Sequence, residues 1–219
     1  DSQKMDGTVI VDVPMLSNGE LNYGLSHIKK KLYEENVYPS EIGFDIMSLA
    51  TMVYMADTRI ERVVHGQDSW TREIELEIPV SNVEIWDSQI RTVERMLKFL
   101  TGDLWKITLS SRAWQFNNLE EVREKSNKYD EVSLFSGGMD SLISTINLME
   151  NKKNTLLISH AGEGLTKNAQ KNIVNKFDLL YPDVLHTWLD LWMVFPRDYI
   201  PAGGNDNNTR SRSFLFIGY

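Results

Sequence analysis

The sequence contains no cysteine, and its 219 residues include only four histidines. Without cysteine, the chain has no disulfide bond, no zinc site with thiolate ligands and no thiol nucleophile. The histidines occur without the HxxxH or HExxH spacing of a helical metal site, so we expect each at the surface or in the core. They are His27, His65, His160 and His186.

Long apolar runs and basic residues are also scarce. No run approaches the roughly 18 apolar residues that a membrane span needs, and no signal peptide is visible. The chain holds 23 Lys and Arg against 31 Asp and Glu, a net charge of −8, and residues 1–130 carry −7 of it. Nucleic-acid binding needs a basic surface and is not expected. We expect a cytoplasmic protein without a membrane partner, whose acidic front half tolerates a basic or neutral protein partner.

A glycine motif stands at residues 131–141, which read EVSLF and then SGGMDS. The apolar run predicts a strand, the Gly-Gly pair predicts a turn, and Asp140 opens a segment with apolar residues at helical spacing. A strand, a tight turn and a helix N-terminus line up backbone N–H groups that suit a phosphate. Ser136 and Ser141 add hydroxyl donors, and Asp140 can hold the Mg²⁺ of a polyphosphate. The alternative is an ordinary strand-to-helix turn.

Residues 1–130 predict an α+β module. Strands are predicted at 8–13, 72–80 and 105–109, and 112–116 is predicted to continue the sheet. Helices are predicted at 21–35 and 45–62. A third helix is predicted to be capped by Asp87 and to end at Gly102. The basic patch at residues 29–31 is interpreted as a solvated helix end. No motif in this module indicates chemistry, so its predicted role is structural, a substrate lid or a partner surface.

From residue 131 onward, alternating strands and helices predict right-handed crossovers and a parallel sheet. The expected elements are a buried strand at 155–160, a helix at 166–180, a strand at 184–191, a loop at 196–208 and a helix after Arg210. Ligands of such sheets bind beyond the carboxyl ends of the strands, where Ser136, His160 and the Trp192 region converge. Arginines there can neutralise phosphates, and the alternative is a pair of surface arginines.

The motif SGGMDS lacks the lysine of a Walker A loop. It resembles the SGGxDS signature of PP-loop ATP pyrophosphatases, which split ATP between its α and β phosphates. The order of the later elements is similar to that of the 7-cyano-7-deazaguanine synthase (QueC) branch, with Arg212 as the counterpart of its P-x-R-N arginine and Ser213 where asparagine is usual. The missing zinc cysteines and the long N-terminal module depart from the synthase. Together with TREIELEIPV and LKFLTGD, this module resembles QatC-type proteins of bacterial anti-phage defence systems.

The resemblance implies an α/β fold class. A C-terminal PP-loop domain of the adenine nucleotide alpha hydrolase type, with a parallel sheet, is expected at 131–219 and is expected to be incomplete at its C-terminus. An α+β N-terminal domain is expected at 1–130. The implied catalytic residues are Asp140 and Arg212, and Asp140 is also the implied magnesium ligand. The residues implied to bind ATP are Ser136, Gly137, Gly138, Asp140, Ser141, Ser159 and His160.

The implied activity is that of an AMP-forming ligase with ATP and Mg²⁺ as cofactors and no zinc. It adenylates a small-molecule carboxylate that resembles a deazapurine acid, releases pyrophosphate and leads to an amide, nitrile or conjugate in anti-phage defence, with co-encoded defence proteins as partners. The alternative is a non-catalytic ATP-binding subunit of a defence complex. An RNA-modifying PP-loop enzyme is disfavoured, because the chain is acidic and lacks the cysteines that enzymes of this kind generally use.

Overall fold

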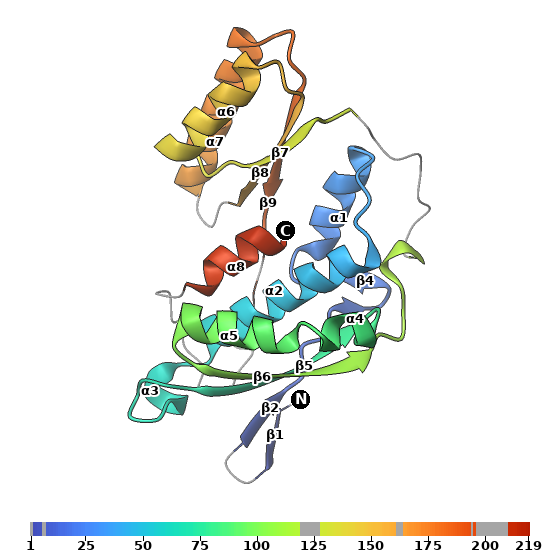
Figure 1. Ribbon diagram of the computed structural model, residues 1–219, viewed down its shortest axis with the longest axis vertical. Helices are drawn as coiled ribbons and strands as arrows, with labels where there is room; N and C mark the ends of the chain where they lie inside the picture. The colour runs from blue at the N-terminus through green and yellow to red at the C-terminus, as the bar shows by residue number, and fades with distance from the viewer. Residues whose placement is uncertain (1, 6–7, 119–127, 161–163, 194, 196–209) are drawn as a thin grey trace. The chain divides into compact units, whose positions relative to one another are not determined.

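The chain divides into two compact units in a computed structural model that describes residues 2–5, 8–118, 128–160, 164–193, 195 and 210–219 (Figure 1). Unit 1 comprises residues 1–19, 39–121 and 195–219, and unit 2 comprises residues 20–38 and 122–194. Both units therefore draw on segments from either side of residue 130, the domain boundary that the sequence suggests. None of the helices in the described residues combines the length and apolar character that crossing a membrane requires.

Unit 1 contains an antiparallel pair, β1 with β2, and a parallel pair, β5 with β6. Its elements are β1 (Ser2–Met5), β2 (Thr8–Val11), β3 (Leu16–Ser17), α2 (Glu41–Arg59), α3 (Arg62–His65), β5 (Glu73–Val80), α4 (Val83–Asp87), α5 (Ile90–Thr101), β6 (Leu104–Ser111), the 3-10 helix η1 (Phe116–Asn118) and α8 (Ser211–Gly218). The three strands predicted in residues 1–130 are confirmed as β2, β5 and β6. The alternation of residues along β5 predicts that Ile74, Leu76, Ile78 and Val80 face inward; Leu76 is half-buried and the other three are buried.

Two predictions in unit 1 are wrong. Asp87 does not cap the helix that ends at Gly102, because Asn82 caps the short helix α4 and Asp87 is the last residue of α4. Residues 112–116 do not continue the sheet. The guanidinium of Arg112 instead bonds Glu41 on α2, and the carboxylate of Glu41 also accepts the backbone N–H of Phe116 at 3.0 Å. Through these bonds residues 112–116 lie against α2, and η1 begins at Phe116.

Buried ion pairs hold the parallel pair of unit 1 to its helices. The guanidinium of Arg72 is 1 % exposed and bonds the carboxylates of Asp57 and Asp103. Arg62 reaches the other oxygen of Asp103 at 2.5 Å. Burial alone would raise the pKa of Asp103, but the hydrogen bonds from Arg72 and Arg62 outweigh it and hold the pKa below its usual range. The carboxylate of Asp103 therefore stays ionised inside the unit.

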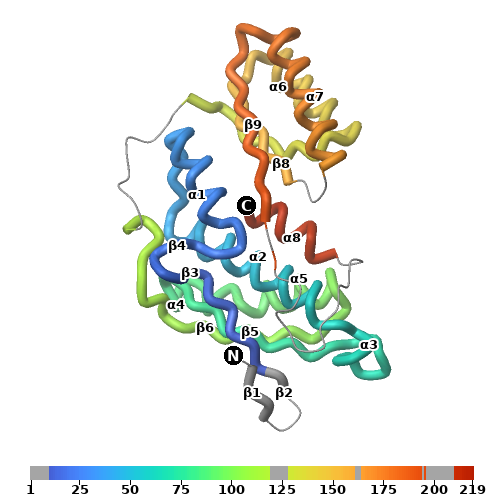
Figure 2. Tube along the Cα trace, turned by 180° about the vertical axis from the view of Figure 1, so that it is seen from behind, coloured from blue at the N-terminus to red at the C-terminus, as the bar shows by residue number. Residues whose placement is uncertain are grey.

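Unit 2 is a parallel three-stranded sheet with the order β7-β8-β9, which confirms the parallel sheet predicted after residue 131. Its elements are β4 (Glu20–Leu21), α1 (Leu25–Glu34), β7 (Glu131–Leu134), α6 (Met139–Glu150), β8 (Thr155–His160), α7 (Gly164–Leu180) and β9 (His186–Leu191). Because the sheet order equals the chain order, two crossovers of one hand place α6 and α7 on the same face (Figures 1 and 2).

The core of unit 2 lies between the sheet and these two helices. Its buried members are Phe135, Met149, Leu157, Val174, Phe177 and Val184. Helix α1 packs against β9, and its start is set by Gly24, where a Cβ would lie 2.4 Å from the carbonyl oxygen of Trp192. Glycine is required there for both the close approach and the φ of +89°. Residues 20–38 thus complete a fold whose sheet begins about a hundred residues later.

Candidate functional site

The predicted phosphate loop lies between the end of β7 and the start of α6. Phe135 is buried, and its N–H bonds the carbonyl of Ile158 at 2.7 Å, so the chain is still anchored to β8 at this point. Gly137 then takes a φ of +80°, and Gly138 returns to extended backbone as the residue before α6. This left-handed step, which only glycine takes without strain, turns the chain from the strand into the helix. The predicted strand–turn–helix unit is present.

The two serine side chains of the loop meet across it. Their Oγ atoms lie 3.1 Å apart, although Ser136 and Ser141 stand on opposite sides of the glycine pair. The hydroxyl of Ser141 donates to the carbonyl of Gly138 at 2.9 Å, and the N–H of Gly138 donates to Ser136 Oγ at 3.3 Å. Ser136 and Gly138 are exposed. The loop therefore presents hydroxyl and amide groups together on a solvent-facing surface.

The N-terminus of α6 makes the loop electropositive. In a helix of this length, the N–H groups of the first residues, here 139–141, have no carbonyl partner in the preceding turn. No side chain caps α6, so these donors and the positive end of the helix dipole face the loop. Asp140 lies in the first turn and is exposed. One carboxylate beside an anion site fits Mg²⁺, which takes one or two carboxylates together with phosphate oxygens and water.

Ser159 and His160 end the neighbouring strand β8. The hydroxyl of Ser159 is 2 % exposed; it donates to the carbonyl of Phe135 and accepts the indole N–H of Trp188 at 2.8 Å. The hydroxyl of Ser159 therefore links the end of β7 to β9 by two hydrogen bonds at the carboxyl edge of the sheet. His160 is partly exposed at this edge. Seven of the eight predicted site residues thus lie on the carboxyl edge of one sheet, at the ends of β7 and β8 and at the start of α6.

Arg212 is the predicted site residue that belongs to the other compact unit. It lies on α8, which packs on α2 in unit 1. Its side chain is exposed, and its guanidinium lies 5.3 Å from the centre of the Phe216 ring. The loop predicted at 196–208 falls outside the described residues.

The sequence interpretation missed a charged cluster at the end of β9. Asp190 pairs with Ser159 in the sheet register, and its carboxylate bonds both Lys31 of α1 and Lys167 of α7. Lys31 also donates to the carbonyl of Asp190 at 3.0 Å. Burial, followed by the charge of Lys167, lowers the pKa of Lys31. The interpretation of the basic patch as a solvated helix end is therefore wrong for Lys31, because its partner is remote in sequence.

A second missed residue is Gln170 on α7. It is fully buried, and its Nε2 donates to the carbonyl of Ser136 at 3.0 Å. The signal was present in the sequence, because Gln170 extends the apolar stripe of Val174 and Phe177 at helical spacing. An amide in such a stripe is unusual enough to indicate a specific contact.

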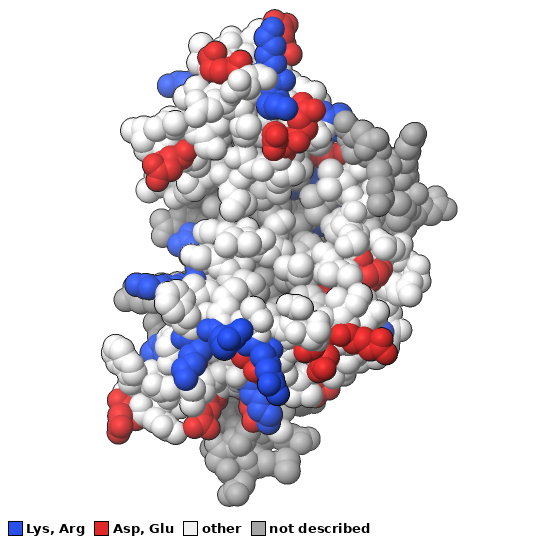
Figure 3. Space-filling view, in the orientation of Figure 1, with Lys and Arg blue, Asp and Glu red and all other residues white. Residues whose placement is uncertain are grey.

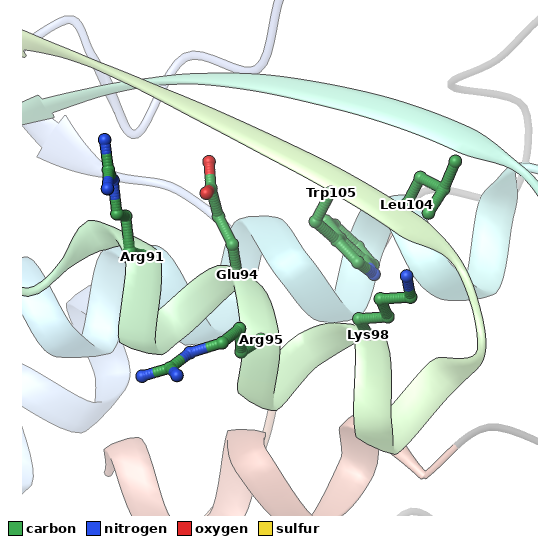
Figure 4. Close-up of a pocket in the computed structure, with 6 residues that line it drawn as sticks. All are labelled: Arg91, Glu94, Arg95, Lys98, Leu104 and Trp105. Atoms are coloured by element: carbon green, nitrogen blue, oxygen red, sulfur yellow. The ribbon is translucent and has the colours of Figure 1, made fainter.

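Unit 1 has a groove of its own, with a volume of about 510 Å³, between α5 and β6. Basic side chains gather on the face that α5 occupies (Figure 3). Within the groove, the side chains of Arg91, Glu94 and Lys98 extend toward β6, whereas Arg95 points away (Figure 4). The carboxylate of Glu94 already has a partner in the protein, since it accepts a hydrogen bond from the N–H of Ile107 at 2.9 Å on the outer edge of β6. None of the predicted site residues lines this groove.

Searches against protein-family models, curated proteins and solved structures found no match to the chain.

Proposed function

We propose that the chain is an AMP-forming, ATP-dependent ligase of the PP-loop type. The observation that supports this best is the loop of unit 2, where Ser136 and Ser141 meet at the uncapped start of α6, beside Asp140. No lysine follows the second glycine, so the loop lacks the group with which a Walker A loop holds the β- and γ-phosphates for γ-phosphoryl transfer. Cleavage between the α and β phosphates is what the resemblance of SGGMDS to the PP-loop signature implies.

In this proposal, the residues of the loop bind and orient the triphosphate. The β- and γ-phosphates accept hydrogen bonds from the amide of Gly137 and, in place of the contacts that these groups make within the loop, from the amide of Gly138 and the two serine hydroxyls. Asp140 would hold Mg²⁺, which would neutralise charge on the phosphates. The adenine lies at the end of β8. Because the hydroxyl of Ser159 is already bonded on both sides, the contacts to adenine come from the backbone there and from His160. The resemblance assigns the stabilisation of the leaving pyrophosphate to Arg212, which belongs to unit 1.

The proposed reaction has two balanced steps. An oxygen of the substrate carboxylate forms a bond to the α-phosphorus of ATP. The bond from that phosphorus to the bridging oxygen breaks, and the electron pair leaves on pyrophosphate. An amine then attacks the acyl carbon of the adenylate, loses a proton and displaces AMP, which gives an amide. Positioning and charge stabilisation account for the first step, so it needs no general base.

The substrate class follows from the resemblance to the QueC-like family. We propose a deazapurine carboxylic acid as substrate and a co-encoded defence protein or small amine as acceptor. The test is to incubate the protein with Mg²⁺, ATP and a panel of deazapurine acids in the presence of hydroxylamine, which traps an acyl adenylate as a hydroxamate. We expect pyrophosphate and hydroxamate in equal amounts with one of the acids. Pyrophosphate without hydroxamate across the panel would contradict a carboxylate substrate, and ADP as the product would contradict the ligase proposal.

A further inference from the structure

Gln170 combines complete burial with an unsatisfied polar atom. The residue is 0 % exposed, and its Oε1 has no hydrogen-bond partner among the residues that the structure describes. Leaving a buried acceptor unpaired costs about 1–3 kcal/mol. An apolar side chain of similar length would therefore pack against Val174 and Phe177 at a lower cost. This suggests that the amide of Gln170 has a use other than packing.

The contacts of Gln170 are with the phosphate loop. Its Nε2 donates to the carbonyl of Ser136 at 3.0 Å, and a Cβ placed on Gly137 would lie 3.1 Å from its Cγ. The side chain thus supports the loop from the interior of unit 2, directly behind the Ser136–Gly137 peptide. Within the described part of the chain, the other polar group of the side chain, Oε1, makes no hydrogen bond that could compete for its orientation.

Because a peptide group is planar, the hydrogen bond from Gln170 to the carbonyl of Ser136 also fixes the direction of the N–H of Gly137. The carbonyl of Ser136 and the N–H of Gly137 belong to one peptide group, and the described chain contains no cis peptide bond. In a trans peptide, the C=O and N–H vectors point in opposite directions. Because Gln170 holds the carbonyl toward the interior, the N–H of Gly137 points outward, to the side where Ser136 and Gly138 are exposed. A rotated peptide would present a carbonyl oxygen there, which repels a phosphate.

We propose that Gln170 is a positioning residue for nucleotide binding, which fixes the Ser136–Gly137 peptide so that the N–H of Gly137 faces the triphosphate. This inference rests on the proposed function, because it takes ATP as the ligand of the loop. On this proposal, the affinity of the loop for ATP depends on the side chain of Gln170, which lies in the core about thirty residues further along the chain. That side chain itself does not contact the nucleotide.

Two substitutions with similar shape separate this role from packing. Gln170→Met keeps the length of the side chain and removes the donor, and Asn172→Met makes the same type of change at an exposed position of α7. Binding of Mg²⁺ with the non-cleavable analogue α,β-methylene-ATP is measured by calorimetry. We expect Gln170→Met to raise Kd about tenfold without lowering the melting temperature, because a misoriented amide loses a charge-assisted hydrogen bond. Asn172→Met is expected to leave Kd unchanged.

Gln170→Glu adds a pH readout, because the positioning role requires the affinity for the analogue to recover when the new side chain is protonated. The ionised side chain cannot donate to the carbonyl of Ser136, whereas the protonated one can, and burial raises the pKa of a carboxyl group into an accessible range. We expect the ratio of its Kd to that of the wild type to be about 100 at pH 8 and about 3 at pH 5. The ratio for Gln170→Met is expected to stay constant over this range.

The outcomes distinguish the inference from the function on which it rests. If the wild type does not bind the analogue, the proposed function fails. If the wild type binds it and Gln170→Met binds equally tightly, the positioning role is refuted and the proposed function stands. Should Gln170→Met fail to fold, the pH dependence of Gln170→Glu decides instead: a Kd ratio that does not fall between pH 8 and pH 5 overturns the role.

Discussion

Replacing Gly138 with alanine should abolish most ATP binding while leaving the fold intact. The φ of Gly138 is −82°, which any residue adopts, and an added Cβ would lie 3.4 Å from Ser136 Oγ, an ordinary contact. The cost to the free energy of unfolding should therefore stay within about 1 kcal/mol, most of it from alanine being a poorer N-cap than glycine. The new methyl group, however, stands on the exposed side of the loop, where the phosphates must approach.

The expected loss of affinity follows from the hydrogen bond that the methyl group blocks. One charge-assisted hydrogen bond to phosphate contributes about 1.5–3 kcal/mol, and we expect the methyl group to block one. We therefore expect the Kd for Mg²⁺ and α,β-methylene-ATP to rise about 10- to 100-fold, measured by calorimetry beside a thermal melt. A folded Gly138→Ala protein that binds the analogue as tightly as the wild type would refute the assignment of the phosphate site.

Two other glycines serve as comparisons for this experiment. Gly137 has a φ of +80°, and its Cβ would lie 3.1 Å from the buried Gln170, so Gly137→Ala should lose both ATP binding and roughly 2 kcal/mol of stability. Gly102 has a similar φ of +79° with no atom within 4 Å of an added Cβ. Gly102→Ala should lose about 1–2 kcal/mol without any change in ATP binding. The three variants thus separate backbone strain from obstruction of the site.

Three further predictions concern the buried network of unit 1 and Arg212. Asp103→Asn leaves Arg72 buried without one of its counter-charges, so denaturant titration should show that the free energy of unfolding falls by about 3 kcal/mol. A fall of less than about 1 kcal/mol would contradict the role of the network. Because the folded-state pKa of Asp103 is held below its usual value, its contribution should be fully present above about pH 4 and disappear as the pH falls toward the folded-state pKa. Asp103→Asn should therefore flatten the acid limb of a plot of stability against pH, and an unchanged limb would argue against the assignment. Arg212→Ala should leave the melting temperature unchanged, because the side chain is exposed, but slow pyrophosphate release about 100-fold or more; unchanged turnover would remove Arg212 from the mechanism.

The parallel sheet of unit 2 could be predicted because its signals are local. The continuous apolar run at 155–160 is typical of a strand buried on both faces, and the structure places β8 at the same residues. The glycine motif likewise indicated a turn between strand and helix, because Gly-Gly supplies a φ that other residues avoid. Predictions of this kind depend on neighbours within a few residues.

The parts that could not be predicted depend on partners remote in sequence. Lys31 looked like a solvated lysine beside Lys30, yet its ammonium group bonds Asp190 of β9. Arg112 followed a strand pattern, but its charge is satisfied by α2 rather than by the sheet. The position of Gln170 in an apolar stripe indicated a specific contact, but not that its partner is the carbonyl of Ser136. In each case a polar group had to find a partner that periodicity does not identify.

The most direct test of the central claim is to identify which phosphate bond of ATP the protein cleaves. The protein is incubated with Mg²⁺, the deazapurine acid panel and ATP labelled separately at the α- and γ-phosphates, and the labelled products are separated. We expect the α label in AMP or in an adenylated product and the γ label in pyrophosphate. Recovery of the γ label as free inorganic phosphate, with the α label in ADP, would contradict it.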